Sequence, residues 1–457
     1  MGNALNNSPI LELQDLSFTY AVNKTPTLQS VNLTLYPGEV VWIAGTTGSG
    51  KSTLLNCIAG ISPSHTGGRL AGKIQIGGQD VGNWSLRERS RQCCTLLQNV
   101  ETQIFTDQVW DELIFGLENW AVEPSHIAPM AAQSLQEFGL ADQADWAIAR
   151  LSAGQKQRLL LASMLAIGQP ILLFDEPLAY LDAQGVELWL HLLTERRQKG
   201  DAILVIEHRA ELMTRLCNRA YRLQDGQLSE WNPQDIERAT AISLDITPRS
   251  PQEPRPAPEI CVLRTQNVAW GGYPAYPDLT LYAGEAVLLK GDNGCGKTTL
   301  LRLISGLLQP DQGEIELMGQ TTRRKRGTAI AKIVGFVLQN PNHQLFAESV
   351  HAEVAQPGTD PKIATELLTN LDLMKLSDRH PHSLSQGQKR RLALAAVLVR
   401  QPQLCLLDEI MVGQDGRSLL LMLHALNAFT QVGGTLLFTS HDPRVVDPLN
   451  ARVVNLP

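Results

Sequence analysis

GTTGSGKSTLL, residues Gly45 to Leu55, is the most informative stretch of this chain. It fits the pattern G-x-x-x-x-G-K-[ST], in which glycines let backbone N–H groups turn inward around a phosphate. Lys51 would reach the β- and γ-phosphates of a nucleotide, and the Ser52 hydroxyl would bind Mg²⁺. Val40 to Ala44 before the loop indicates a buried strand, and Ser52 to Ala59 after it indicates a helix. The sequence therefore predicts a phosphate-binding loop between a strand and a helix.

The same loop occurs a second time. GDNGCGKTTLL, from Gly291 to Leu301, repeats it 246 residues later, and the preceding NLTLYPGEVVWIAG matches DLTLYAGEAVLLKG. A self-match of such long period indicates two copies of one domain. Within the second loop, Cys295 is either a reactive thiol at a helix start or a thiol packed into the core. The predicted nucleotide-binding residues of the two loops are Gly45, Thr46, Thr47, Gly48, Ser49, Gly50, Lys51, Ser52 and Thr53, and Gly291, Asp292, Asn293, Gly294, Cys295, Gly296, Lys297, Thr298 and Thr299.

Length and composition agree with two domains. The 457 residues suit copies at 1–235 and 260–457, joined by a proline-rich linker at 236–259. The formal net charge of −7 provides no overall basic field, so we expect no nucleic-acid partner. The seven cysteines are scattered without metal-ligand spacing, which suits a reducing cytosol. No apolar run reaches the roughly 18 to 20 residues that span a bilayer, so we expect no membrane-crossing segment.

A glutamine follows a β-like run in each copy. TLLQNVETQIF contains Gln98, and FVLQNPNHQLF contains Gln339. An amide at a strand end can reach Mg²⁺ or an attacking water, although a lone glutamine is more often a surface residue. The matched position in both copies favours the functional interpretation.

LSAGQKQR at 151–158 and LSQGQKRR at 384–391 each begin a helical pattern. A serine and a glycine at a helix start, where backbone N–H groups are free, indicate a second anion site, here for a γ-phosphate. The distance from this serine to the aspartate of the next motif is 23 residues in both copies. The predicted contributors are Ser152, Gly154 and Gln155, and Ser385, Gly387 and Gln388.

Two further motifs lie at the ends of predicted strands. ILLFDEP and LCLLDEI present an acidic pair, whose Asp would hold Mg²⁺ through water and whose Glu would polarise the attacking water. Otherwise such a pair is often a helix cap. ILVIEHR and LLFTSHD place a histidine 33 residues past each Asp, where it can bind the γ-phosphate. The predicted catalytic residues are Glu176, His208, Gln98, Glu409, His441 and Gln339, and the predicted Mg²⁺ ligands are Ser52, Gln98, Asp175, Thr298, Gln339 and Asp408.

Alternating apolar and polar residues indicate antiparallel strands ahead of the first loop, at Leu11 to Tyr20 and Val31 to Leu35. Tyr20 would either stack on adenine or pack against a neighbouring strand residue. In the second copy the corresponding aromatic is Trp270 or Tyr273.

The ordered set of loop, glutamine, LS-x-GQ, strand-DE and histidine, present twice, resembles the ATP-binding cassette (ABC) family over nearly the whole chain outside the linker. The resemblance implies an α/β fold of two tandem nucleotide-binding domains, each with a P-loop α/β core, an antiparallel β subdomain and a helical signature subdomain. It also implies ATP and Mg²⁺ as cofactors, and an intramolecular head-to-tail pairing in which each ATP lies between the loop of one cassette and the signature of the other. One site would combine Lys51, Ser52, Gln98, Asp175, Glu176 and His208 with Ser385 and Gly387; the other would combine Lys297, Thr298, Gln339, Asp408, Glu409 and His441 with Ser152 and Gly154.

Within that family, the runs QNVETQIF and QNPNHQLF and the tandem arrangement look like energy-coupling-factor importers. This resemblance implies a peripheral subunit at the cytoplasmic face of the membrane. Its partners would be a transmembrane scaffold subunit and a small substrate-binding membrane subunit, and the cargo a vitamin or a transition-metal ion. The alternative is a soluble tandem cassette that acts on ribosomes or nucleic acid.

The two copies also depart from the family pattern. Ile410 stands where the first copy has Pro177, and Gln414 stands where it has Leu181. Both sites keep their Glu and His, so we expect two competent but unequal sites. The usual glycine of the signature is replaced in both copies, by Ala153 and Gln386.

Overall fold

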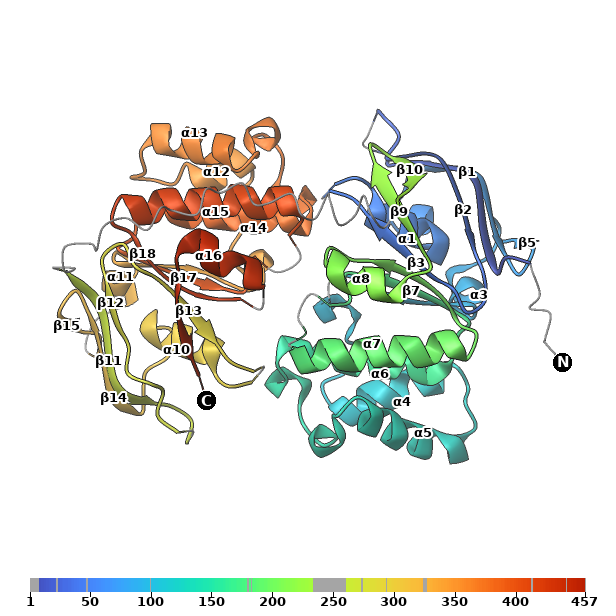
Figure 1. The fold of residues 1–457 in the computed structure, drawn as a ribbon, viewed down its shortest axis with the longest axis horizontal. Coiled ribbons are helices and arrows are strands. Elements are labelled where there is room, and N and C mark those ends of the chain that lie inside the picture. Colours follow the sequence, from blue (N-terminus) through green and yellow to red (C-terminus); the bar gives the residue numbers. More distant parts are fainter. Residues whose placement is uncertain are drawn as a thin grey trace. The chain divides into compact units, whose positions relative to one another are not determined.

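The computed structural model describes residues 8–21, 24–46, 48–98, 100–178, 181, 183–232, 260–272, 274–292, 294–323, 327–411, 414–440 and 442–456. The chain divides into two compact units, Met1–Ala241 and Ile242–Pro457 (Figure 1). This division falls inside the predicted linker 236–259, which lies outside the described residues.

The first unit contains an antiparallel sheet of order β2-β1-β4-β5. The predicted antiparallel pair is confirmed, since Leu13 faces Leu33 across β1 and β2. Along β1 and β2, buried residues mostly alternate with partly or fully exposed ones, because successive side chains of a strand point to opposite faces. The strands are β1 Leu11–Thr19, β2 Leu28–Leu35, β4 Arg69–Ile76 and β5 Gln79–Asp80.

A second sheet in this unit has the order β10-β9-β3-β8-β7-β6 and is parallel except for β10. The predicted strand at Val40–Ala44 is its β3, and every residue of β3 is buried. Figure 1 shows α1 and the antiparallel sheet on one side of β3 and β7, with α4 to α7 on the other. The remaining strands are β6 Cys93–Leu96, β7 Ile171–Asp175, β8 Ala202–Ile206, β9 Arg219–Gln224 and β10 Gln227–Glu230, and the helices are α1 Lys51–Ala59, α2 Ile61–Ser64, α3 Leu86–Ser90, α4 Val109–Asn119, α5 Pro124–Glu137, α6 Ala153–Ile167, α7 Ala183–Gln198 and α8 Ala210–Leu216.

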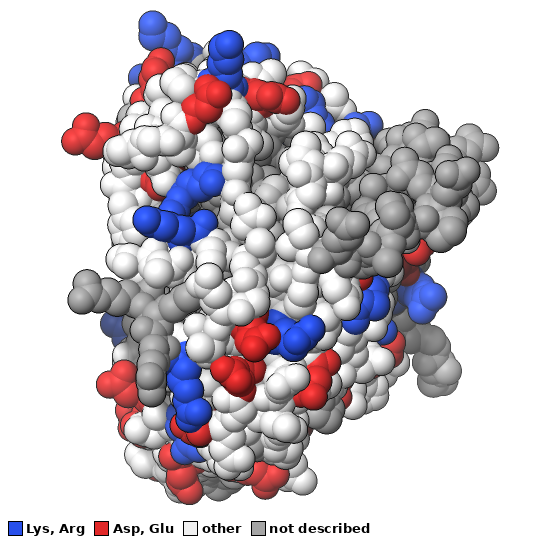
Figure 2. Space-filling model, turned by 90° about the vertical axis from the view of Figure 1, so that its left-hand side faces the viewer, with Lys and Arg blue, Asp and Glu red and all other residues white. Residues whose placement is uncertain are grey.

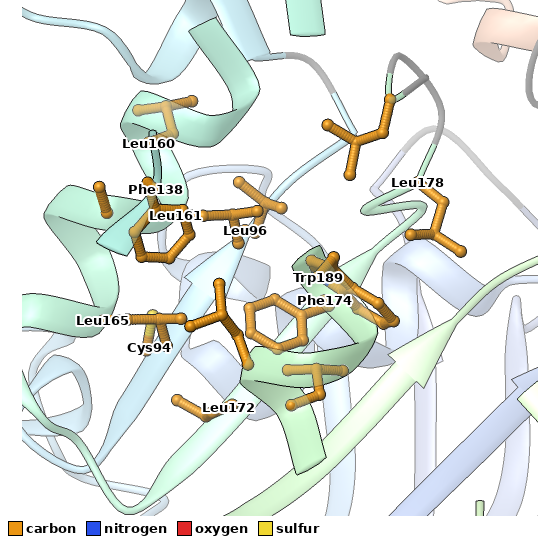
Figure 3. Packing of buried hydrophobic residues seen from close by; sticks show 14 of the residues in the cluster. Cys94, Leu96, Phe138, Leu160, Leu161, Leu165, Leu172, Phe174, Leu178 and Trp189 are labelled. Atoms are coloured by element: carbon orange, nitrogen blue, oxygen red, sulfur yellow. The ribbon is translucent and has the colours of Figure 1, made fainter. Parts of the chain in front are cut away.

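Alternate residues of the buried strands belong to two cores. Val41 and Ile43 pack with α1 and the antiparallel sheet. Trp42 faces the opposite core. Phe174 and Trp189 belong to the same core, and their ring centroids lie 6.1 Å apart (Figure 3). Burial on both faces explains why the strand sequences are continuously apolar, as expected for a parallel sheet covered on both sides.

The second unit repeats this arrangement. Its antiparallel sheet has the order β12-β11-β14-β15, and its parallel sheet has the order β16-β17-β18-β13-β19. The predicted α/β fold with two copies of one domain is therefore confirmed. The strands are β11 Cys261–Ala269, β12 Thr280–Tyr282, β13 Ala286–Lys290, β14 Gln312–Leu317, β15 Gln320–Thr321, β16 Val334–Val337, β17 Leu404–Asp408, β18 Thr435–Thr439 and β19 Arg452–Asn455, and the helices are α10 Lys297–Ile304, α11 Gly327–Ile330, α12 Val350–Val354, α13 Pro361–Asn370, α14 Gln386–Leu398, α15 Gly416–Gln431 and α16 Val446–Leu449.

The face of the molecule drawn in Figure 2 carries charged groups of both signs. On the face drawn in Figure 2, Lys and Arg atoms alternate with Asp and Glu atoms without a broad area of one sign. None of the helices in the described ranges is long and apolar enough to cross a membrane.

Candidate functional site

Both predicted phosphate-binding loops run from the end of a strand into a helix. In the first loop, Lys51 Nζ donates to the carbonyl oxygens of Gly45 (2.7 Å) and Thr46 (3.0 Å). Lys297 Nζ makes the matching bonds to Gly291 (2.7 Å) and Asp292 (2.9 Å). Each buried ammonium is therefore held at the mouth of its loop, where an anion would meet it. Thr47 and Asn293 lie outside the described residues.

Glycine is required where the loop enters its helix. Gly50, the residue before α1, has φ 104°, and a Cβ there would come within 3.0 Å of the Thr27 carbonyl oxygen. Gly296 before α10 has φ 94°. Residues with a side chain rarely adopt this left-handed backbone conformation, so the backbone geometry explains the glycine before the lysine in both loops.

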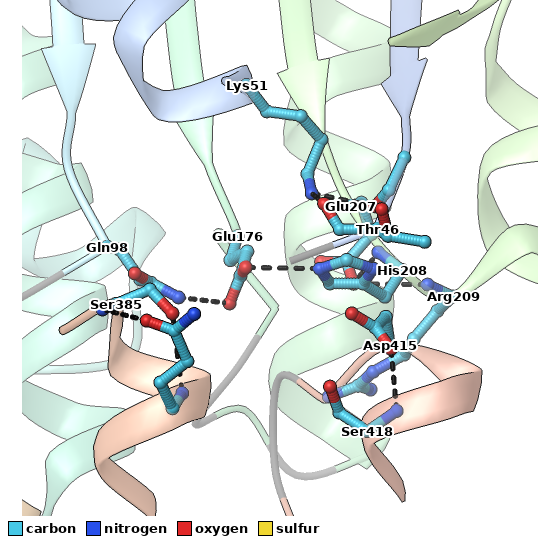
Figure 4. A network of polar contacts seen from close by, with 12 residues as sticks. Thr46, Lys51, Gln98, Glu176, Glu207, His208, Arg209, Ser385, Asp415 and Ser418 are labelled. Atoms are coloured by element: carbon cyan, nitrogen blue, oxygen red, sulfur yellow. Dashed lines mark hydrogen bonds and ion pairs between the residues drawn. The ribbon is translucent and has the colours of Figure 1, made fainter. Parts of the chain in front are cut away.

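The glutamate of each acidic pair, its second residue, is held in an uncommon backbone conformation at the end of its strand. Glu176 has φ 52° and Glu409 has φ 50°. Non-glycine residues with such values cost free energy and cluster at functional sites. Gln98 Nε2 donates to Glu176 Oε2 (2.7 Å), and His208 Nε2 lies 3.2 Å from Glu176 Oε1 (Figure 4). These two predicted partners therefore meet on one carboxylate.

The second unit repeats part of this network. Gln339 Nε2 donates to Glu409 Oε2 at 3.1 Å. His441, the predicted catalytic histidine of the second copy, lies outside the described residues. The glutamine and the strand-end glutamate are thus brought together in both copies.

The two carboxyl groups of the first acidic pair have pKa values that are shifted in opposite directions. Burial, together with the neighbouring Glu176, raises the pKa of Asp175 to about 7. Burial also opposes ionisation of Glu176, but the hydrogen bonds and charge of His208, with the amide of Gln98, outweigh it and lower the pKa of Glu176. Glu176 is thus the ionised member, which suits a group that accepts hydrogen bonds from water.

A hydroxyl accompanies each aspartate. Ser52 is hydrogen-bonded to Asp175, and Thr298 Oγ1 donates to Asp408 Oδ1 at 3.1 Å. Burial and Glu409 raise the pKa of Asp408 to about 6. A hydroxyl and a carboxylate are hard oxygen ligands of the kind Mg²⁺ prefers. Among the described residues no three His, Cys, Asp or Glu side chains could hold a metal together, so phosphate and water oxygens would complete the coordination.

The signature motifs form the same capping box twice. Ser152 Oγ accepts from the N–H of Gln155 (3.2 Å), and Gln155 Oε1 accepts from the N–H of Ser152 (2.9 Å). Ser385 and Gln388 repeat both bonds at 3.3 and 3.0 Å. This reciprocal cap explains the Ser-x-x-Gln spacing and starts α6 and α14 with their N–H groups facing outward. Gly154 and Gly387 lie in the first turns of these helices.

Each unit has an aromatic residue that contacts the loop or the helix after it, and in the second unit it is not one of the two expected residues. Tyr20 is half-buried against Phe18, with ring centroids 4.8 Å apart, and its hydroxyl lies 3.0 Å from Thr53 Oγ1. In the second unit Trp270 packs into the core, and Tyr273 lies outside the described residues. Tyr276 instead contacts the loop, because its hydroxyl donates to the Gly296 carbonyl oxygen at 3.3 Å. The shorter segment before the second loop concealed this position in the sequence.

Cys295 is half-buried and packs against the core beside the antiparallel sheet of its unit. A Cβ built on Gly291 would lie 2.6 Å from the Cys295 sulfur, so the thiol fills the space beside this glycine. This placement favours the packing interpretation of the thiol.

The segment after each strand-end glutamine is held by a second glutamine and by a glutamate further along the chain. Neither was predicted from the sequence. Gln103 accepts from the Leu97 N–H (3.0 Å) and donates to the Leu97 carbonyl oxygen (2.9 Å). Glu112 Oε2 accepts from the N–H groups of Phe105 (3.0 Å) and Thr106 (2.9 Å). Their identical spacing in the two copies was the available signal. The counterparts are Gln344, bonded to Leu338, and Glu353, bonded to Phe346 and Ala347.

Comparisons with known proteins agree with this geometry. The family described as ABC transporter matches residues 28–179 and 276–412. A protein of Methanosarcina mazei, described as a candidate ABC transporter ATP-binding protein, is 31% identical over 510 residues, covering 96% of this chain and 86% of its own. A similarly described protein of Methanosarcina acetivorans is 28% identical over 472 residues, covering 98% and 88%.

Solved structures with a similar fold include RNase-L Inhibitor, with a TM-score of 0.63 at 21% identity, covering 96% of this chain and 87% of its own. A structure of the complex of archaeal ribosomal stalk protein aP1 and the archaeal ribosome recycling factor aABCE1 also has a TM-score of 0.63, at 22% identity and the same coverage. At this identity the likeness concerns the fold.

Proposed function

Because the chain belongs to the ABC transporter family of ATP-binding proteins and carries that family's ATPase domain twice, we propose that it hydrolyses ATP at two sites to drive transport through separate membrane subunits. We assign it to the energy-coupling-factor type of importer, in which a transmembrane scaffold and a small substrate-binding membrane subunit take up a vitamin or a transition-metal ion. Its place would be the cytoplasmic face of the membrane. The motif runs after Gln98 and Gln339 support this assignment.

The chemistry at the first site follows from the ionised Glu176. Its carboxylate can accept a hydrogen bond from a water and raise the water's nucleophilicity toward the γ-phosphorus. Gln98 and His208 fix this carboxylate from two sides, so little reorganisation is needed when the substrate arrives. Lys51 would place its ammonium on the β- and γ-phosphates. Glu409 and Gln339 would act in the same way in the second unit.

Mg²⁺ fits the aspartate and hydroxyl beside each loop. Ser52 with Asp175, and Thr298 with Asp408, would hold it together with phosphate oxygens. When bound, Mg²⁺ neutralises developing charge on the phosphates.

The observation that carries the transport assignment is a pair of rigidly held, exposed phenylalanines. Phe105 is 71% exposed and Phe346 is 81% exposed. Their backbones are nevertheless fixed by the buried carboxylates of Glu112 and Glu353. A pre-ordered exposed aromatic lowers the entropic cost of binding and is characteristic of an interaction anchor.

The two anchors are not identical. Phe105 stacks at a tilt on Phe115, with centroids 5.5 Å apart, so the first unit exposes an aromatic pair. In the second unit Gln356 stands ten residues after Phe346, at the position that Phe115 occupies relative to Phe105. Two different anchors suit two different contacts on one membrane scaffold.

Hydrolysis is tested by replacing the water-polarising groups. Glu176→Gln and Glu409→Gln should each lower ATP turnover, by about 100-fold at the altered site, because an amide is a poor acceptor for a water proton. ATP binding should persist because Lys51 and Lys297 are unchanged. Phosphate release and filter binding measure the two quantities. A double variant that hydrolyses ATP at the parental rate would refute the assignment of these residues.

Transport is tested by purification with partners. The chain should co-purify with membrane proteins from detergent-solubilised membranes, and the double variant Phe105→Ala, Phe346→Ala should lose them while keeping basal ATPase activity. Leu307→Ala, which changes another exposed side chain (66%), is the matched control. Retention of the membrane partners by the phenylalanine variant, or association with ribosomes instead, would overturn the proposal.

A further inference from the structure

The two acidic pairs are supported by different residues on the adjacent strand. In the first unit β7 pairs with β8, so that Asp175 faces Ile206. In the second unit β17 pairs with β18 in the same register, and Asp408 faces Thr439. The same position of the repeat therefore carries an aliphatic side chain in one copy and a hydroxyl in the other.

Thr439 uses its hydroxyl on both members of the second acidic pair. Its Oγ1 donates to Asp408 Oδ1 at 3.0 Å and accepts from the N–H of Glu409 at 2.9 Å. Thr439 is 1% exposed and Asp408 is 2% exposed, so water does not compete for these bonds. The hydroxyl thus ties the side chain of the aspartate to the left-handed backbone of the glutamate.

Ile206 cannot do this in the first unit. There the N–H of Glu176 bonds to the Ile206 carbonyl oxygen at 2.9 Å. Asp175 Oδ1 is buried and has no hydrogen-bond partner among the described residues. A buried carboxylate oxygen without a donor is costly and poorly fixed in orientation.

We propose that Thr439 is a positioning residue of the second ATP site, and that the Ile206/Thr439 difference makes the two sites unequal in metal-dependent nucleotide binding. With Thr298 and Thr439 both on Oδ1, Asp408 presents its other oxygen in a fixed direction before the cofactor arrives. Asp175 is held by the Ser52 hydroxyl but has no donor on Oδ1, so its carboxylate is less firmly oriented before the cofactor arrives. The second site therefore retains the metal more tightly. This inference rests on the proposed Mg²⁺–ATP chemistry but not on the membrane partners.

The test measures metal retention at each site, without turnover. Full-length chain carrying Lys51→Ala reports on the second site, and chain carrying Lys297→Ala reports on the first. Free Mn²⁺ is followed by electron paramagnetic resonance in the presence of a non-hydrolysable ATP analogue. In the first background, Thr439→Val should weaken Mn²⁺ retention by about tenfold, because it removes a hydrogen bond to a charged group. Thr439→Ser should retain the parental value, since it keeps the hydroxyl.

The reciprocal variant and a metal-free measurement complete the design. In the second background, Ile206→Thr should strengthen Mn²⁺ retention several-fold. Binding of the analogue in EDTA should be unchanged in all variants. If Thr439→Val retained Mn²⁺ as well as the parent, the inference would be overturned while the metal assignment would stand. The same holds if Thr439→Val lost analogue binding in EDTA as much as it lost Mn²⁺ retention, because that result would indicate a packing role. A parent that binds the analogue without retaining Mn²⁺ would overturn the metal assignment and the inference together.

Discussion

Asp175 is a residue at which function opposes stability. Its pKa is raised from 3.8 to about 7, first by burial and then by Glu176. Because the folded state binds the proton more tightly than the unfolded state, the free energy of unfolding falls as pH rises from about 4 to about 7. In EDTA and without nucleotide, Asp175→Asn should therefore increase the free energy of unfolding at pH 8, by on the order of 2 kcal/mol, while abolishing turnover at its site.

The same measurement at pH 4 provides the control for Asp175→Asn, because the wild-type carboxyl is then protonated in the folded state and the difference should largely vanish. Asp408→Asn should gain less at pH 8, since the pKa of Asp408 is raised only to about 6 and two hydroxyls already satisfy its Oδ1. Urea unfolding followed by circular dichroism measures both. A stability of Asp175→Asn that parallels the parent from pH 4 to pH 8 would contradict this account.

At the scale of elements, different residues lie against the C-terminal end of the helix that follows each loop. The buried Arg89 donates to the Cys57 and Ile58 carbonyl oxygens at the end of α1, at 2.8 and 3.1 Å. Arg89→Met should cost about 2 to 4 kcal/mol in urea unfolding, because it leaves buried carbonyl groups without donors. Arg87→Met on the exposed face of α3 is the control and should be nearly neutral. In the second unit the aliphatic Ile330 lies in the corresponding space beside Gly306, and its side chain has no group that could donate a hydrogen bond to α10. Similar losses in both variants would argue against a capping role.

The sequence predicted elements whose signal is local or repeated. Strand β3, helix α1 and the Ser152 cap follow from apolar runs, glycine positions and capping spacing, and the repeat singled out Gln98 and Glu176, which the structure brings together. Contacts that depend on strand register or on distant segments could not be predicted. Thr439 meets Asp408 only because β17 and β18 pair in one particular register, and Arg89 bonds to residues of α1 that lie 31 and 32 positions before it in the chain. Tyr276 was missed because the segment before the second loop differs in length from the first.

At the scale of the whole molecule, the head-to-tail pairing that the family resemblance implies would make each ATP site a composite of two cassettes. Ser152→Asp and Ser385→Asp test this, because aspartate caps a helix about as well as serine but places a negative charge toward the γ-phosphate. If the sites are composite, Lys51→Ala combined with Ser385→Asp damages the same site twice. The turnover of this double variant should then remain at about half or more of the turnover of either single variant. Lys51→Ala combined with Ser152→Asp damages both sites, and turnover should fall to background.

Comparing these double variants distinguishes composite from independent cassettes. Independent cassettes reverse the order, because Lys51 and Ser152 then belong to one site and Ser385 to the other. Ser152→Asn and Ser385→Asn are the matched neutral controls, since asparagine keeps the cap without the charge. Steady-state phosphate release from the four double variants, each checked for an unchanged melting temperature, gives the result. Fusion of the cassettes raises their effective concentration, so the outcome should not change on dilution of the protein. A strong dilution dependence would show that pairing occurs between chains instead of within one.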